Sequence, residues 1–139
     1  MSHLRIGKTN TRRGPLFPNL DFGVSRAVRA GNLVFLQGQT GLKLDQSGFV
    51  GEGDPGAQAE TAMQNVRTLL EEAGARMEDI CKITTYVTEV SYRDQVYPVI
   101  ARHLRGVDPV GTGLVVKALA ETYIDFEIDV IAVIPAERS

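Results

Sequence analysis

An apolar stripe at helical spacing constrains the fold of this chain more than any other feature of its sequence. The stripe consists of Ala59, Ala62, Met63, Val66, Leu69, Leu70 and Ala73. Steps of three and four residues place these side chains on one face of a helix of about five turns. Asp54 is a suitable N-cap, Pro55 suits the first turn, and Gly74 suits the C-terminal end. The pattern therefore predicts one long helix packed on an apolar layer.

Strands are predicted on both sides of this helix. The turn signal Gly31-Asn32 joins two β-rich runs, which is typical of a hairpin. Residues 42–52 are interpreted as a third short strand or a wide loop. Three later segments also have strand-like patterns, because they either alternate β-branched and polar side chains or are mostly apolar. The predicted strands cover residues 24–30, 33–39, 81–88, 112–118 and 126–134.

A second helix is predicted after residue 90. Ser91 is placed at its N-cap, with Asp94 in a capping-box position and Gly106 beyond its end. Pro98 conflicts with this interpretation, because an interior proline removes a hydrogen bond and kinks a helix.

The resulting element order is β-β-(β)-α-β-α-β-β, an α+β fold in which two helices cover one face of a mixed sheet. On the last strand the second face reads Glu127, Asp129, Ile131 and Val133, polar at one end and apolar at the other. A strand that is apolar on both faces needs cover on both faces. Because one chain supplies too few helices for this, the pattern favours a homo-oligomer with its sheet faces turned inward.

The composition of the chain indicates which partners and which metal or disulfide sites it can have. Charged residues make up 23% of the chain and the formal net charge is -2, so we expect no nucleic-acid or membrane partner. The single cysteine, Cys81, excludes an internal disulfide and is interpreted as buried and inert. With only two histidines beside it a Cys/His zinc cage cannot form, and we expect neither metal nor cofactor.

The chain is expected to form one domain. Residues 1–20 have little apolar periodicity and are interpreted as an irregular N-terminal arm, whereas residues 21–139 form the folded domain. We find no apolar run of secretory or membrane-spanning length, so a cytoplasmic location is expected.

Five segments occur in a characteristic order: VSRAVRAGNLVFLQGQ, QNVRTLLEEAG, ITTYVTEV, DPVGTGLVVKALA and FEIDVIAV. From about Val24 to Val133 the chain resembles the RidA/YjgF family of reactive-intermediate (enamine/imine) deaminases, also described as L-PSP endoribonuclease-like. The resemblance implies a chorismate-mutase-like fold and a homotrimer with ligand clefts at the subunit interfaces. It also implies hydrolysis of enamines and imines such as 2-aminoacrylate to a keto acid and ammonia, without metal or cofactor.

The chain departs from the family at two positions. Deaminating members carry an arginine two residues after a proline, which holds the substrate carboxylate as a bidentate pair. Here Pro109 is followed by Val110 and Gly111, so the arginine is missing. Many members also have a tyrosine where this chain has Val24. The resemblance retains Glu127 as the residue that positions the attacking water, so we expect a reshaped cleft with an altered ligand.

The predicted site combines Glu127 as catalytic residue with five substrate-binding residues. These are Val24, Gln37, Gly38, Gly111 and Thr112. Each has a plainer alternative: Glu127 and Asp129 could be a solvated sheet rim, and Gly38 could mark a β-bulge. The sequence leaves open whether Arg26, Arg105 or Lys117 replaces the missing arginine.

Two functions from different classes remain open. The first is hydrolysis of an enamine or imine other than the standard amino-acid imines, with Glu127 orienting water. The second is a non-catalytic protein that binds or senses a small metabolite in the same cleft. An endoribonuclease or translation inhibitor is a remote alternative, because there is no basic stripe and only four tyrosines and five phenylalanines to stack bases.

Overall fold

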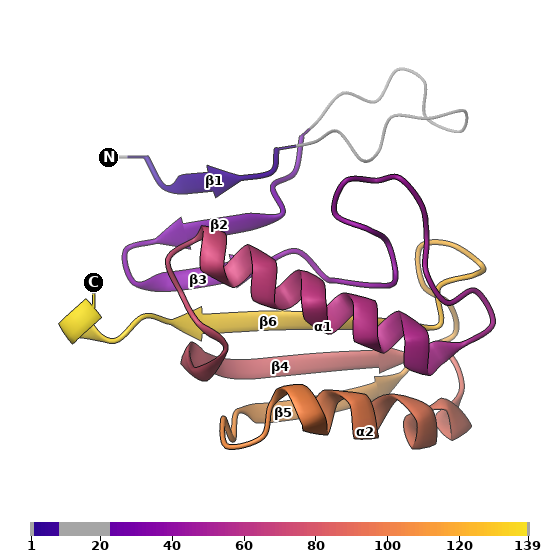
Figure 1. The fold of residues 1–139 in the computed structure, drawn as a ribbon. Coiled ribbons are helices and arrows are strands. Elements are labelled where there is room, and N and C mark those ends of the chain that lie inside the picture. Colours follow the sequence, from indigo (N-terminus) through magenta and orange to yellow (C-terminus); the bar gives the residue numbers. More distant parts are fainter. Residues whose placement is uncertain (1, 9–22, 139) are drawn as a thin grey trace.

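A six-stranded mixed sheet forms the centre of the molecule in this computed structural model, which describes residues 2–8 and 23–138. The strand order is β1-β2-β3-β6-β4-β5; β4 and β5 are parallel, and the other neighbours are antiparallel. Both helices lie on the same side of the sheet (Figure 1). The strands are β1 (Leu4–Ile6), β2 (Ala27–Ala30), β3 (Leu33–Leu36), β4 (Ile80–Val87), β5 (Val110–Val115) and β6 (Phe126–Val133), and the helices are α1 (Pro55–Glu72) and α2 (Arg93–His103). The predicted α+β class and one-sided helix layer are confirmed.

Helix α1 begins and ends where its sequence signals predict. The Asp54 side chain accepts a hydrogen bond from the Ala57 amide at 3.1 Å, and Pro55 occupies the first turn. Gly74 follows the helix with φ +87°, a conformation that glycine adopts at little cost. The apolar stripe is buried against β3 and β6 and forms the core with their inward side chains. Its largest fully buried members are Met63, Leu69 and Leu70 from α1, with Phe126, Ile128 and Val130 from β6.

The strands before α1 differ from the prediction in one respect. The hairpin β2-β3 turns at Gly31, which has φ +62°, as expected. Residues 42–52 contribute only an isolated bridge between Leu42 and Phe49 and are otherwise a loop. The third strand is instead β1, within the segment expected to be irregular, and it pairs with β2. The rest of the expected arm, residues 9–20, lies outside the described residues.

The predicted start of α2 is wrong. A short 3-10 helix covers Val90–Tyr92, α2 begins at Arg93, and Ser91 makes no side-chain cap. Pro98 lies inside α2 on its exposed side. There water can hydrogen-bond to the carbonyl group of Asp94, which lacks the usual helical donor.

Cys81 is exposed, so the prediction that it is buried is also wrong. The pairing of β4 with β6 shifts register between Ile80 and Lys82. Such an irregularity breaks the alternation of side chains, and Cys81 and Lys82 are both exposed in succession. Alternation toward the core resumes further along β4, where Thr85 and Val87 are buried.

Among the described residues, no helix covers the second face of the sheet (Figure 1). This uncovered face carries apolar as well as polar side chains. The apolar ones alternate along their strands with residues that face the helices, and they pair across strands with residues that also face outward. They are Leu33 and Phe35 at 41% exposure, Val133 at 38%, Leu114 at 44% and Val110 at 67%. The two-sided apolar character expected from the sequence is therefore present.

Candidate functional site

Glu127 and Asp129 lie on the uncovered face in the first half of β6. Phe126, Ile128 and Val130 are buried on the helix side, so the intervening carboxylates project to the other side. Both acidic residues are partly buried. The two carboxylates therefore face the same space at the start of an otherwise apolar strand face.

Gly38 lies directly against these carboxylates. A Cβ atom at this position would lie 2.8 Å from Asp129 Oδ1 and closer still to the Glu127 carboxylate. The close approach requires glycine, and a bulge alone does not account for it. The neighbouring Gln37 donates its backbone amide to the carbonyl oxygen of Arg26 at 2.8 Å, and its own carbonyl oxygen accepts from the Gln39 side chain. Of the predicted binding residues, Gly38 is the one brought closest to Glu127.

Tyr86 completes the cluster and was missed in the sequence. Its hydroxyl donates a hydrogen bond to Asp129 Oδ2 at 2.7 Å, and this bond raises the pKa of Tyr86 to about 12. Tyr86 stands opposite Glu127 in the antiparallel register of β4 and β6. The alternation of β4 places Tyr86 on the polar face, but its partner depends on strand pairing that the sequence did not supply.

The pKa of Glu127 is raised above its usual value. Burial is the main cause because it disfavours the charged form, and the negative charge of Asp129 adds to the effect. A carboxyl group with a raised pKa is a stronger base than an ordinary glutamate. It can accept a proton from water and return it to a leaving group.

Gly111 and Thr112 lie on β5, at the edge of the sheet. The parallel register pairs Gly111 with Ile83 and Thr112 with Thr84. A Cβ at Gly111 would lie 3.3 Å from Ile83 Cγ1, on the helix side of the sheet. Thr112 shares the uncovered face with Glu127, whereas Gly111 faces the other way. The structure therefore does not bring Gly111 and Glu127 together within one protomer.

The remaining candidates are dispersed. Val24 and Arg26 precede β2, three strands away from β4 and further still from β5. The Arg26 side chain packs against Gly7, where a Cβ would lie 2.9 Å from Arg26 Cδ. Arg105 and Lys117 are exposed in the segments that flank β5. Within the described part of the chain, the replacement of the missing arginine by one of these cations stays an untested idea.

A recess of about 340 Å³ lies between α2 and the strand pair β4-β5. Its floor and walls come from both layers: Ile83, Thr85, Tyr97, Ile100, Ala101, Gly111, Thr112 and Gly113. The two glycines present no side chain on the strand side of the recess, and the Tyr97 hydroxyl lies over Gly113. The described residues that line it carry no formal charge.

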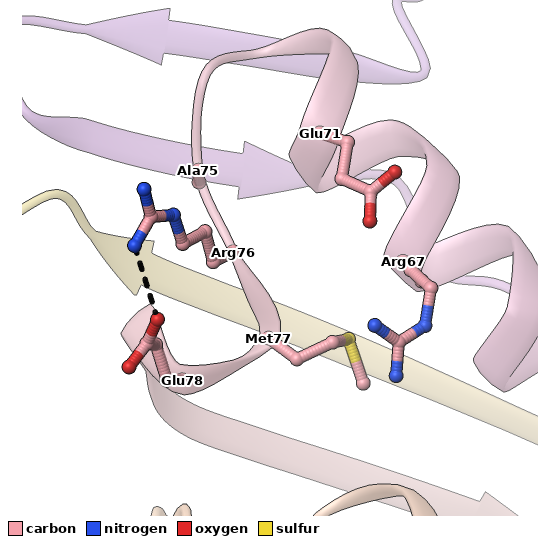
Figure 2. A pocket seen from close by; sticks show the side chains of 6 residues that line it. All are labelled: Arg67, Glu71, Ala75, Arg76, Met77 and Glu78. Atoms are coloured by element: carbon pink, nitrogen blue, oxygen red, sulfur yellow. Dashed lines mark hydrogen bonds and ion pairs between the residues drawn. The ribbon is translucent and has the colours of Figure 1, made fainter.

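A second hollow, of about 490 Å³, lies at the C-terminal end of α1 (Figure 2). Arg67 and Glu71 of α1 extend toward it, and the segment Ala75, Arg76, Met77 and Glu78 closes the other side. Arg76 and Glu78 form an ion pair at 3.4 Å, but both side chains are more than 60% exposed. Exposed pairs of this kind contribute little energy, and none of the predicted site residues lies here.

In the part of the chain that the structure describes, no helix is long and apolar enough to cross a membrane. No three His, Cys, Asp or Glu side chains among the described residues gather closely enough to hold a metal ion.

Comparison with known proteins identifies the family. The model of the family described as endoribonuclease L-PSP matches residues 22–134. The chain belongs to the RidA/YjgF family. Its six-stranded sheet with two helices on one face is the chorismate-mutase-like fold that solved members of this family share.

Relatives within the RidA/YjgF family resemble this chain over most of its length. A 2-iminobutanoate/2-iminopropanoate deaminase from Dermatophagoides farinae is 32% identical over 63% of each chain. The structure of a YjgF/YER057c/UK114 family member from Mycobacterium tuberculosis has a TM-score of 0.74 and 28% identity, covering 96% of this chain and all of the other. RidA from a Psychrobacter species has a TM-score of 0.69 and 29% identity over 80% of this chain and 88% of its own.

Proposed function

We propose that this RidA-family protein hydrolyses an enamine or imine, with Glu127 orienting and deprotonating the attacking water. The observation that carries the proposal is the partly buried Glu127 carboxylate, held beside Asp129 and against Gly38 on the uncovered face. Only glycine at position 38 leaves room for both carboxylates, because even the Cβ atom of alanine would clash with them. The relative that is named as an imine deaminase supports the reaction class.

The chemistry needs one base that later acts as an acid. An enamine first becomes the imine by gaining a proton at carbon and losing one at nitrogen. Glu127 then takes a proton from water while the water oxygen bonds to the carbon of the C=N group, and the nitrogen takes up a proton from the solvent. In the resulting carbinolamine the C–N bond breaks, ammonia leaves, and the oxygen forms a carbonyl group after losing its proton. The raised pKa of Glu127 suits both steps because the protonated form can return its proton to the leaving nitrogen.

We further propose that the protein works as a homotrimer with ligand clefts between subunits. The apolar side chains Leu33, Phe35, Leu114 and Val133 lie on the same face of the sheet as the acidic cluster and are 38–44% exposed in the single chain. Packing of copies on this face would remove them from water. It would also allow a cleft that combines Glu127 of one copy with the Gly111 side of another.

The decisive experiment compares Glu127→Gln with wild type on a panel of imines. The imines are generated in place, those with a carboxylate by an amino-acid oxidase or dehydratase and uncharged ones by an amine oxidase, and release of the keto acid or other carbonyl product is followed. Loss of a general base typically costs 10²–10⁴-fold in rate, so we expect turnover to fall by at least about 100-fold. Glu72→Gln, at the exposed end of α1, is the matched control and should keep full activity. Retained activity in Glu127→Gln, with an unchanged oligomer mass, overturns the proposal.

A non-catalytic metabolite-binding role is the alternative, favoured by the uncharged lining of the recess beside Gly111. It predicts ligand binding without release of a keto acid in the same panel. An RNA-directed role has less support, because the carboxylates of Glu127 and Asp129 would repel phosphate. Any RNA binding that depended on phosphate contacts would weaken steeply as salt rises.

A further inference from the structure

The recess between α2 and the β4-β5 pair contains a buried hydroxyl group that lacks a partner. Thr85 is 5% exposed and lines the recess, and its Oγ1 has no hydrogen-bond partner among the described residues. A buried hydroxyl without a partner costs free energy unless water or a ligand satisfies it. The Thr85 hydroxyl is directed at Gly113, where a Cβ would lie 3.4 Å from it.

Two glycines beside this hydroxyl present no side chain to the recess, and the space over Gly113 is taken by the Tyr97 hydroxyl. A side chain at Gly111 would meet Ile83, and a Cβ at Gly113 would lie 2.5 Å from Tyr97 Oη. Tyr97 therefore lies over Gly113, with a phenol group that can donate or accept a hydrogen bond. The volume of about 340 Å³ is at the lower end of the range for small-molecule sites.

The rest of the lining is apolar or neutral. Ile83, Ile100 and Ala101 supply aliphatic walls, and the described lining residues carry no charge that could pair with an anion. A carboxylate placed here would lose its hydration without gaining a cationic partner. An uncharged group with an apolar body and one polar end would bury its body on the aliphatic walls and satisfy the hydroxyl groups.

We infer that this recess binds an uncharged, amide-like or ring-carbonyl group of the ligand and selects against a carboxylate. The inference rests on the proposed function only for the link between this subsite and the reaction. The hydrogen bonds would come from Thr85 and Tyr97, Gly111 leaves space for the ligand, and Gly113 allows the close approach of Tyr97.

The test uses two probes of the same shape that differ in charge, benzamide and benzoate. Binding to the wild-type protein is measured by calorimetry and by the backbone amide shifts of Gly111 and Gly113. We expect benzamide to bind at least tenfold more tightly than benzoate. Benzoate binding as tightly as benzamide, or no benzamide binding at millimolar concentration, overturns the inference.

Variants locate the site of binding. Gly111→Leu should fill the recess and abolish benzamide binding, and Gly111→Arg should reverse the preference toward benzoate. Thr85→Val keeps the volume and should weaken benzamide binding about threefold to tenfold, which is the loss of one hydrogen bond. Thr84→Val is the matched control, because the Thr84 side chain lies on the opposite face of the same strand. Unchanged binding in Thr85→Val overturns the inference even where a Gly111 variant fails to fold.

The outcome is separable from that of the proposed hydrolysis. Keto-acid release from the imine panel is measured on the same wild-type preparation. If the protein hydrolyses imines but does not prefer benzamide to benzoate, only this inference is wrong. If it binds benzamide selectively but hydrolyses no imine, only the proposed hydrolysis is wrong.

Discussion

At Glu127, burial and the charge of Asp129 act in the same direction, and both raise the pKa. A carboxyl group whose folded pKa lies above its unfolded pKa stabilises the fold at pH values below the unfolded pKa. This contribution is lost as the pH rises through the folded pKa. We therefore predict that Glu127→Gln, which stays neutral, has an equal or higher Tm than wild type at pH 7. Melting curves should converge near pH 4, and a lower Tm for the variant at pH 7 would show that the carboxylate is structural.

Tyr86 holds the neighbouring carboxylate in place through its 2.7 Å hydrogen bond to Asp129. Tyr86→Phe removes this donor, and water can replace it only in part because Asp129 is partly buried. We predict a loss of about 1 kcal/mol in unfolding free energy, measured by urea titration. A further expectation is a fall in imine turnover, since the Glu127–Asp129 geometry is loosened.

The control for this change is Tyr123→Phe. The Tyr123 ring packs edge-on against the Phe49 ring, with 4.8 Å between the ring centroids, and substitution by Phe keeps that contact. No loss of stability is expected there. If Tyr86→Phe and Tyr123→Phe lower the unfolding free energy equally, the hydrogen bond from Tyr86 to Asp129 does not stabilise the fold.

At the scale of elements, α1 is attached to the loop before β6 by one buried polar side chain. Gln58 is fully buried, its Nε2 donates to the carbonyl oxygens of Gly51 and Tyr123 at 2.8 and 3.2 Å, and its Oε1 accepts from the Asp125 amide at 2.9 Å. Gln58→Leu removes all three hydrogen bonds; Gly51 keeps the one that its carbonyl oxygen accepts from the Asp54 amide, whereas the Tyr123 carbonyl oxygen and the Asp125 amide lose their Gln58 partner. We predict a loss of about 3 kcal/mol in unfolding free energy, measured by denaturant titration.

Gln95→Leu is a suitable comparison for that variant. Gln95 lies on the exposed side of α2, so the same substitution removes no buried hydrogen bond. Its stability should stay within about 0.5 kcal/mol of wild type. Equal effects at the two positions would contradict the anchoring role of Gln58.

Helices α1 and α2 are also joined by an ionic contact. Glu60 accepts from His103 Nε2 at 3.0 Å and from Arg102 Nη2 at 2.8 Å. His103 is the main cause that lowers the pKa of Glu60 to about 2, although burial opposes the shift. A lowered folded pKa stabilises the fold above the unfolded pKa of 4.5, and this stability is lost as the pH falls toward 2.

We predict that Glu60→Gln costs about 0.5–1 kcal/mol at pH 6–7, a small value because the side chains of Arg102 and Glu60 are 57% and 34% exposed to solvent. The difference from wild type should shrink steadily as the pH is lowered from 5 to 2. Urea titrations across this range measure it, with Glu71→Gln on the exposed side of α1 as control. A difference that does not depend on pH would mean that the ionic contact contributes nothing.

The elements that the sequence predicted correctly are those whose signals are local. The stripe and caps of α1 and the Gly31 turn each depend on residues within a few positions of one another. Strand β1 is only three residues long and depends on pairing with β2, so no local pattern indicates it. The same holds for the register shift that exposes Cys81.

The candidate site shows the same division. Glu127 and Gly38 were identified by resemblance and by residue type, and the fold brings them together. The roles of Tyr86 and Thr85 depend on which strands and helices become neighbours. That information resides in the packing of elements and could not be obtained from any one segment.

For the whole molecule, the proposed cleft combines two regions that lie on opposite faces of the sheet. Glu127 lies on the uncovered face of the sheet, and the recess at Gly111 lies on the helix side near the β5 edge. A small ligand that touches both therefore needs residues from two chains. Burial of the exposed apolar residues on the uncovered face would stabilise the proposed assembly.

We predict that wild-type protein has the mass of three 15.1 kDa chains in light scattering and native mass spectrometry. Phe35→Glu places a charge among the apolar side chains of the uncovered face, where Phe35 pairs with Ile131, and should shift the protein to monomers. Imine turnover should fall with the trimer if the cleft lies between copies. Thr68→Glu on the exposed side of α1 introduces the same charge and should leave the mass unchanged. A monomeric wild type, or a Phe35→Glu monomer with full turnover, would place the complete active site within one chain.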